Sequence, residues 1–303
     1  MNRRLYVTVF IVIISFYYLC FWHKTDFIKK ELPQALVVGV KKCGTGALRS
    51  FLMQHPDINF NPSEIKFFNH PWNYLRGYRW YVNQFSPRSR EDQIRNGETI
   101  QLTIVSFHQI RIEKTPKYFH EDYVTRLIWN MDPKMKIIIV VREPVKRTIS
   151  DYTQESISGM FHVDISRKLL NRFGEIDPSS ELISPSLYAN HLKRFLEFFP
   201  RSQIHIVDGE NLQRNNPSIE LAKIEKFLGK SNYFTSTKFS NNTTKGYYCF
   251  VSDMGKHKCL GNAKGRRQEL VDERVVSKLK QFFKCHNEDF FRIVMKLEQQ
   301  DDL

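Results

Sequence analysis

One stretch near the start of the chain decides the fold: Leu36-Val37-Val38-Gly39-Val40-Lys41-Lys42-Cys43-Gly44-Thr45-Gly46-Ala47-Leu48. It opens with a short apolar run that lacks helical spacing, which predicts a buried strand. A turn rich in lysine and glycine follows, and the next residues have the pattern of a helix that ends before Pro56. A strand, a turn and a helix N-terminus in this order form an anion pocket, because backbone N–H groups and the helix dipole favour a negative ligand. Lys42 and the Thr45 hydroxyl would add direct contacts to a phosphate.

The spacing of Gly39 and Gly44 is that of a P-loop, but the rest of the loop differs. A loop that binds nucleoside triphosphates continues with Lys and then Ser or Thr. Here Thr45 and Gly46 follow, and Lys42 lies two residues before Gly44. The sequence therefore argues against a kinase, and it leaves two interpretations of the loop: a site for another phosphate-bearing ligand, or an ordinary strand-to-helix turn.

Length and charge narrow the class of protein. The 303 residues suffice for one large domain or two small ones. The net charge of +14, from 46 basic and 32 acidic residues, predicts a polyanionic partner, which could be nucleic acid, an anionic membrane, or a sulfated or phosphorylated substrate.

The N-terminus predicts a membrane anchor. Residues 5–22 are uncharged and close to the shortest length that spans a bilayer. The alternative is a cleaved signal peptide, but the apolar region is long for one and no A-x-A-like cleavage site follows it. We expect a cytosolic tail at 1–4, a transmembrane signal anchor at 5–22, a short stem at 23–33, and one luminal domain at 34–303.

Cysteine and asparagine patterns agree with a luminal domain. A disulfide bond between Cys249 and Cys259 would close a small hairpin-like loop, as an oxidising compartment allows; two free thiols are the alternative. Asn241 and Asn242 begin overlapping glycosylation sequons. A luminal location argues against nucleic acid as the partner and favours a polyanion such as a glycosaminoglycan.

Beyond the loop, strand and helix patterns alternate. Residues 136–141 and 203–207 read as strands, and helix patterns begin near Val145 and span 188–199 and 219–228. This alternation predicts an α/β fold with a mostly parallel sheet. Ligands bind such sheets at the carboxyl ends of the strands, where both 42–46 and 142–150 would lie. The sequence contains no compact cluster of His, Cys and Asp with metal-ligand spacing.

Seven segments, in order, resemble the heparan sulfate glucosamine 3-O-sulfotransferase family, which are Golgi type II membrane sulfotransferases. Together they span nearly all of the chain from Gln34 onward. They are Gly39-Val40-Lys41-Lys42-Cys43-Gly44-Thr45, Glu64-Ile65-Lys66-Phe67-Phe68, Glu113-Lys114-Thr115-Pro116, Val141-Arg142-Glu143-Pro144 through Ser150-Asp151-Tyr152-Thr153-Gln154, Ile204-His205-Ile206-Val207-Asp208-Gly209, Thr244-Lys245-Gly246-Tyr247-Tyr248-Cys249, and Cys259-Leu260 with Lys264-Gly265-Arg266.

The resemblance implies a single P-loop-like sulfotransferase domain with a central, mostly parallel sheet flanked by helices. It implies transfer of a sulfo group from 3′-phosphoadenylyl sulfate (PAPS) to the 3-hydroxyl of glucosamine in heparan sulfate, with 3′,5′-bisphosphoadenosine as product and no metal. The family's donor contacts map onto Lys42, Cys43, Gly44, Thr45 and Gly46 for the 5′-phosphosulfate, Arg142 and Ser150 for the 3′-phosphate, and Lys264, Gly265, Arg266, Arg267 and Gln268 in a C-terminal loop.

The resemblance also assigns the acceptor contacts and the catalytic groups. Acceptor contacts map onto Glu64, Ile65, Lys66, Phe67, Phe68, Asn69 and His70, and onto Lys114, Thr115, Pro116 and Lys117. Glu64 corresponds to the general base that a sugar hydroxyl needs. Lys42 would stabilise the leaving bisphosphate, and Lys114 would steady the transferring group. The family's disulfide maps onto Cys249 and Cys259.

Five positions depart from the family pattern. Cys43 replaces a glycine but still offers its backbone N–H, and Glu143 replaces an aspartate, which is a mild change. Gly46 replaces an arginine that would face the acceptor, Lys66 replaces a histidine, and Asn69 replaces an aspartate. These departures keep two alternatives open. One is a luminal sulfotransferase of different regiospecificity, and the other is a catalytically weakened protein that binds heparan sulfate.

Overall fold

The computed structural model describes residues 32–85, 109–157, 164–230, 232–242, 246–261 and 269–301. The predicted tail and anchor, all but two residues of the stem, and the donor-loop residues 264–268 lie outside this part of the chain. Among the described residues, no helix combines the length and the apolar character needed to cross a bilayer.

A five-stranded parallel sheet organises the domain, with the strand order β2-β3-β1-β4-β5. The strands are β1 Ala35–Gly39, β2 Ile58–Phe60, β3 Ile110–Lys114, β4 Lys136–Val141 and β5 Ile204–Asp208. Every residue of β1 is buried, as are the middle four of β4. These two strands lie at the centre of the sheet because their continuous apolar side chains fill both of its faces.

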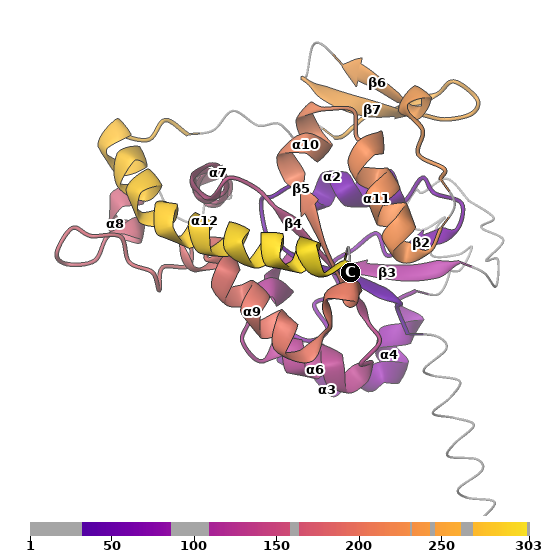
Figure 1. Ribbon diagram of the computed structural model, residues 1–303, viewed down its shortest axis with the longest axis horizontal. Coiled ribbons are helices and arrows are strands. Elements are labelled where there is room, and N and C mark those ends of the chain that lie inside the picture. The colour runs from indigo at the N-terminus through magenta and orange to yellow at the C-terminus, as the bar shows by residue number, and fades with distance from the viewer. Residues whose placement is uncertain are drawn as a thin grey trace, which may run out of the picture.

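Helices cover both faces of the sheet. Figure 1 shows α2, α10 and α11 on one side and α6 and α9 on the other. Their bounds are α2 Thr45–Leu52, α3 Pro71–Leu75, α4 Gly77–Asn83, α6 Val124–Met131, α7 Pro144–Ile157, α8 Ile165–Leu169, α9 Tyr188–Phe198, α10 Gly209–Arg214, α11 Ser218–Leu228 and α12 Glu273–Asp301, with 3-10 helices η1 Pro116–Phe119, η2 Ser184–Ser186, η3 Arg201–Gln203 and η4 Ser236–Lys238. The prediction of an α/β domain with a central parallel sheet is confirmed.

A small antiparallel sheet follows the main one in the chain, formed by β6 Phe239–Asn242, β7 Tyr247–Val251 and β8 His257–Lys258. A disulfide bond joins Cys249 in β7 to Cys259 just after β8, the pair named from the sequence. Asn241 lies exposed in β6.

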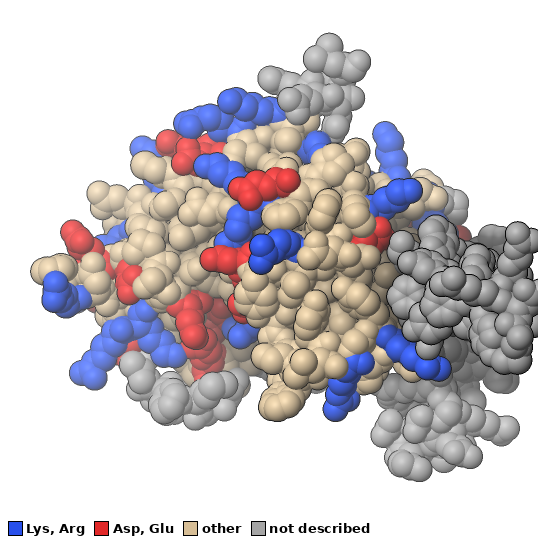
Figure 2. Space-filling model, turned by 90° about the horizontal axis from the view of Figure 1, so that it is seen from below, with Lys and Arg blue, Asp and Glu red and all other residues tan. Residues whose placement is uncertain are grey.

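Positive and negative side chains are interspersed on the face drawn in Figure 2. Among the described residues there, lysine and arginine side chains alternate with aspartate and glutamate. The excess of positive charge in the sequence is therefore not gathered into one continuous patch on this face.

Candidate active site

The loop between β1 and α2 has the geometry of an anion site. Gly44, with a φ of 106°, lies at the N-cap of α2, and Thr45 begins the helix with its side chain buried. Lys42 has a φ of 72°, a left-handed conformation that is uncommon outside glycine. Its Nζ donates to Gln154 Oε1 at 3.4 Å, and Lys41 Nζ lies 2.7 Å from Asp151 Oδ1. The two lysines thus fasten the loop to α7.

The second predicted donor segment follows β4. Arg142 comes directly after the strand, and Ser150 is half-buried in α7. The Glu143 carboxylate caps the first turn of α7 by accepting from the backbone N–H groups of Val145 at 3.0 Å and Lys146 at 2.7 Å. The cap fixes the direction in which the helix leaves the strand, and therefore places Ser150 relative to Arg142.

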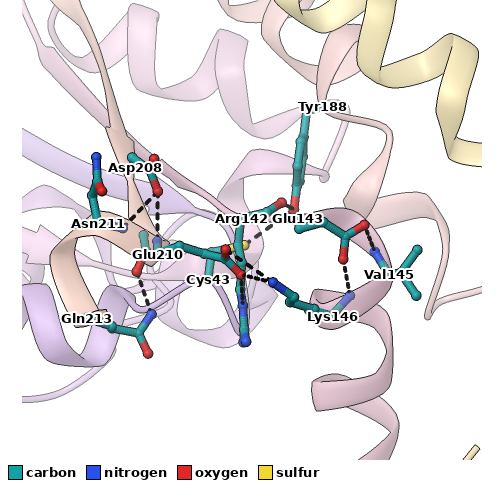
Figure 3. A network of polar contacts seen from close by, with 11 residues as sticks. Cys43, Arg142, Glu143, Val145, Lys146, Tyr188, Asp208, Glu210, Asn211 and Gln213 are labelled. Carbon is teal, nitrogen blue, oxygen red and sulfur yellow. Dashed lines mark hydrogen bonds and ion pairs between the residues drawn. The ribbon is translucent and has the colours of Figure 1, made fainter. Parts of the chain in front are cut away.

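Glu210 lies between two cations at this position (Figure 3). Its Oε1 is 3.4 Å from Arg142 Nε and 2.9 Å from Lys146 Nζ. The sequence analysis named Arg142 but missed Lys146 and Glu210. The sequence did contain a pattern that could have placed both residues at this site. Glu210 follows the end of a strand, and Lys146 lies four residues, about one helical turn, after Arg142. Two cations that converge on one carboxylate are suited to hold a phosphate.

Cys43 links the two donor segments. Its buried thiol lies 3.4 Å from the Tyr188 hydroxyl, which donates to the Arg142 carbonyl oxygen at 2.9 Å. Because that bond uses the single hydroxyl proton of Tyr188, the thiol is the donor to the Tyr188 oxygen. Burial raises the pKa of Cys43 to about 11, so the side chain remains a thiol, and it is free of any disulfide bond.

Gly209 allows α10 to approach the donor loop closely. A Cβ atom at this position would overlap the Cys43 carbonyl oxygen and would lie 2.9 Å from the Val141 carbonyl oxygen. The Asp208 side chain then caps α10 by accepting from the N–H groups of Glu210 at 2.8 Å and Asn211 at 3.0 Å. The absence of a side chain at Gly209 therefore brings Glu210 beside Arg142.

Glu64 and Lys114 form an ion pair at the carboxyl ends of β2 and β3. Glu64 Oε1 lies 2.7 Å from Lys114 Nζ, and the side chains are 36% and 7% exposed, respectively. Burial lowers the pKa of Lys114, and the bond to Glu64 opposes that shift. The structure thus brings together the predicted base and the predicted lysine at the sheet edge that carries Lys42 and Arg142.

The segment after Glu64 alternates between core and solvent. Ile65, Phe67 and Phe68 are buried, whereas Lys66 and His70 are exposed and Asn69 is partly buried. Thr115 and Pro116 are also buried, and Lys117 is exposed. In this structure, therefore, Lys66, His70 and Lys117 of the predicted acceptor site face solvent, while its apolar members, Lys114 and Thr115 are buried.

No group of three or more His, Cys, Asp or Glu side chains within the described ranges could hold a metal ion. The charged groups at the strand ends of this site include those of Lys42, Glu64, Lys114, Arg142, Lys146 and Glu210.

The fold is that of the sulfotransferase class of proteins. A family described as the sulfotransferase domain matches residues 32–299. A sulfotransferase from Alicyclobacillus acidocaldarius has the same fold, with a TM-score of 0.50 and 24% identity over 67% of this chain and 83% of that chain.

Similar proteins from mammals identify the family within the sulfotransferase class. Heparan sulfate glucosamine 3-O-sulfotransferase 5 of Mus musculus is 35% identical over 280 residues, which cover 89% of this chain and 74% of that protein. Heparan sulfate glucosamine 3-O-sulfotransferase 6 of Mus musculus is 37% identical over 269 residues, or 88% and 72% of the two chains. The chain belongs to the heparan sulfate glucosamine 3-O-sulfotransferase family.

Proposed function

We propose that this protein transfers a sulfo group from PAPS to the 3-hydroxyl of glucosamine residues in heparan sulfate. The observation that carries the proposal is the Glu64–Lys114 pair, with its 2.7 Å contact, at the same edge of the sheet as the anion loop. A sulfo transfer needs a base on the acceptor side and cations on the donor side, and the chain supplies both there.

Glu64 is the general base. Its side chain is the more exposed member of the pair, so a sugar hydroxyl arriving from solvent can reach it. When Glu64 accepts the hydroxyl proton, the buried Lys114 ammonium loses its carboxylate partner. That positive charge is then available to the transferring group and its developing negative charge.

Lys42, Arg142 and Lys146 suit a donor that carries phosphates at two positions. Lys42 lies in the loop at the N-terminus of α2, where it would stabilise negative charge on the departing phosphate. Arg142 and Lys146 already hold a carboxylate, and we assign the 3′-phosphate to them together with Ser150. The donor, when bound, supplies the sulfo group and a phosphate leaving group.

The acceptor is a sulfated polysaccharide, and we assign its contacts to Lys66, His70 and Lys117, whose side chains are exposed in the two segments that contain Glu64 and Lys114. Their positive charge or hydrogen-bonding capacity suits sulfate and carboxylate groups. Because Lys66 replaces a family histidine, this is also the place where the saccharide preference of the protein would differ from that of its relatives.

Digestion of the product tests the proposal. The luminal domain is incubated with labelled donor and heparan sulfate, which is then cleaved to disaccharides. Label on the glucosamine 3-hydroxyl is expected. Label at another position would indicate different regiospecificity, and heparan sulfate binding without transfer would indicate a non-catalytic protein. Glu64→Gln should lower turnover by about 10²–10⁴-fold, whereas Glu197→Gln, at an exposed glutamate of α9, should not.

We also propose that the protein is a single-pass type II membrane protein of the Golgi apparatus with its catalytic domain in the lumen. The uncharged stretch at 5–22, the disulfide bond and the exposed Asn241 in a sequon support this location. Protease protection of the domain in intact vesicles, with glycan on Asn241 or Asn242, is expected. Digestion without detergent would refute the topology.

A further inference from the structure

A buried carboxylate lies beside the proposed base and has no part in the chemistry described above. Glu113, in β3, is completely buried. Its Oε2 accepts from the Tyr81 hydroxyl at 2.6 Å, and its Oε1 accepts from the hydroxyls of Thr115 at 2.5 Å and Tyr118 at 3.0 Å. A buried carboxyl group is tolerated only when it is hydrogen-bonded, and here three hydroxyls meet that need.

The directions of these hydrogen bonds are fixed, because all three hydroxyls donate to Glu113. Burial raises the pKa of Tyr81 and Tyr118 well above 10, so both remain phenols. Each hydroxyl has one proton, and that proton goes to Glu113. The oxygens of Thr115 and Tyr118 are therefore left as acceptors for other donors.

Those other donors belong to the segment that carries the base. The Lys66 backbone N–H donates to Thr115 Oγ1 at 3.2 Å, and the Phe68 backbone N–H donates to the Tyr118 hydroxyl at 3.3 Å. Two chains of hydrogen bonds thus run from the backbone after Glu64, through a hydroxyl, to the Glu113 carboxylate.

The backbone at the end of one chain is in an unfavourable conformation. Lys66 has a φ of 54°, in the left-handed region, which a long side chain adopts only when the surrounding structure imposes it. Lys66 is two residues from Glu64, and Lys114, next to Glu113 in β3, makes the ion pair with Glu64. Two successive residues of β3 therefore hold the segment at 64–68. Glu113 holds its backbone through Thr115 and Tyr118, and Lys114 holds the Glu64 carboxylate.

We propose that Glu113 is a positioning residue, which acts through Thr115 and Tyr118 to hold the backbone of residues 66–68 so that the Glu64 carboxylate lies where an acceptor hydroxyl arrives. The catalytic part of this inference rests on the proposed function. General-base catalysis depends on the position of the base, and small displacements lower the rate.

A pair of matched variants tests the inference. Tyr118→Phe and Tyr81→Phe each remove one hydroxyl from the same buried carboxylate, but only the Tyr118 hydroxyl also accepts from the 64–70 segment. Amide hydrogen exchange of donor-free protein should become faster at Phe68 in Tyr118→Phe and remain near the wild-type rate in Tyr81→Phe. With heparan sulfate, kcat should fall about tenfold in Tyr118→Phe, the scale of one hydrogen bond, and clearly less in Tyr81→Phe.

Binding of the bisphosphate product should be unchanged in both variants, since the hydrogen bonds described for this network join β3, η1, α4 and residues 66–68 and do not involve residues 42–46. Equal exchange rates and equal kcat in the two variants would overturn the inference. If the wild type itself transfers no sulfate, the proposed function fails, and the exchange comparison still decides whether the Glu113 network fixes the segment.

Discussion

Replacing Gly209 by alanine should damage the donor site without touching a charged group. The added methyl carbon would overlap the Cys43 carbonyl oxygen and lie 2.9 Å from the Val141 carbonyl oxygen, whereas ordinary contact begins near 3.4 Å. Both obstacles are backbone atoms, so no side-chain rotation relieves them. The N-terminus of α10 must therefore move away from the loop that contains Cys43.

The expected cost follows from the size of this clash. Overpacking a close contact typically costs about 1–3 kcal/mol, and the backbone overlap places Gly209→Ala in the upper half of that range. For a domain of this size, about 2–3 kcal/mol corresponds to a fall of about 4–12 °C in Tm. Because Glu210 is held by the same helix, the displacement also disturbs its contacts with Arg142 and Lys146.

Thermal unfolding and calorimetry with 3′,5′-bisphosphoadenosine measure the two effects. Gly209→Ala should lower Tm and weaken binding of the bisphosphate by tenfold or more. Gly229→Ala is the matched control, because Gly229 has a φ of 70° and an added methyl carbon there would meet no neighbouring segment within 4 Å. It should lose about 1 kcal/mol of stability through its left-handed backbone and keep its affinity.

An unchanged affinity in Gly209→Ala, together with a Tm equal to that of Gly229→Ala, would refute the reasoning. It would mean that α10 and the loop can separate without cost, and that the close approach at Gly209 does not shape the donor site.

Three further predictions concern binding, the disulfide and pH. Arg142→Ala should weaken bisphosphate binding by about 1.5–3 kcal/mol in calorimetry, because a bond to a charged group is lost. Replacing both Cys249 and Cys259 by serine should lower the unfolding free energy in denaturant by about 2–3 kcal/mol, since the bond closes a loop with a sequence separation of 10. Burial and neighbouring cations lower the pKa of His120 to about 3. Below pH 6.5 the unfolded chain therefore binds a proton at His120 that the folded protein does not, and this histidine should lower stability by up to about 1.4 kcal/mol per pH unit as the pH falls from 6.5 to 5. His120→Gln should remove this contribution and leave those of His191 and His205, whose pKa values burial also lowers.

Controls with exposed residues separate these effects from general damage. Arg292→Ala, at an exposed arginine of α12, should keep bisphosphate affinity, and Cys285→Ser should keep the stability of the wild type. His257→Gln, at an exposed histidine of β8, should leave the pH dependence unchanged. A loss in any control that equals the loss in its partner variant would contradict the corresponding assignment.

Much of the fold could be predicted from the sequence because local patterns determined it. The apolar run at 136–141 forms β4 with the same bounds, and the helix expected at 188–199 ends one residue earlier, at Phe198. The continuous apolar run at 136–141 is typical of a strand buried on both faces, and the apolar spacing at 188–198 matches the helical repeat. Strand β4 and helix α9 were therefore recognisable without any knowledge of their neighbours.

The sequence also indicated the residues to which we assign the chemistry, since the loop at 42–46 and the proposed base Glu64 stand in recognisable segments. Only the tertiary structure decided how these residues are held. The 2.7 Å contact of Glu64 with Lys114 joins residues 50 positions apart. The placement of Glu210 between two cations and the network under Glu113 likewise join distant segments. Local periodicity describes one element at a time, whereas these contacts arise because parallel pairing brings the carboxyl ends of separate strands to one edge.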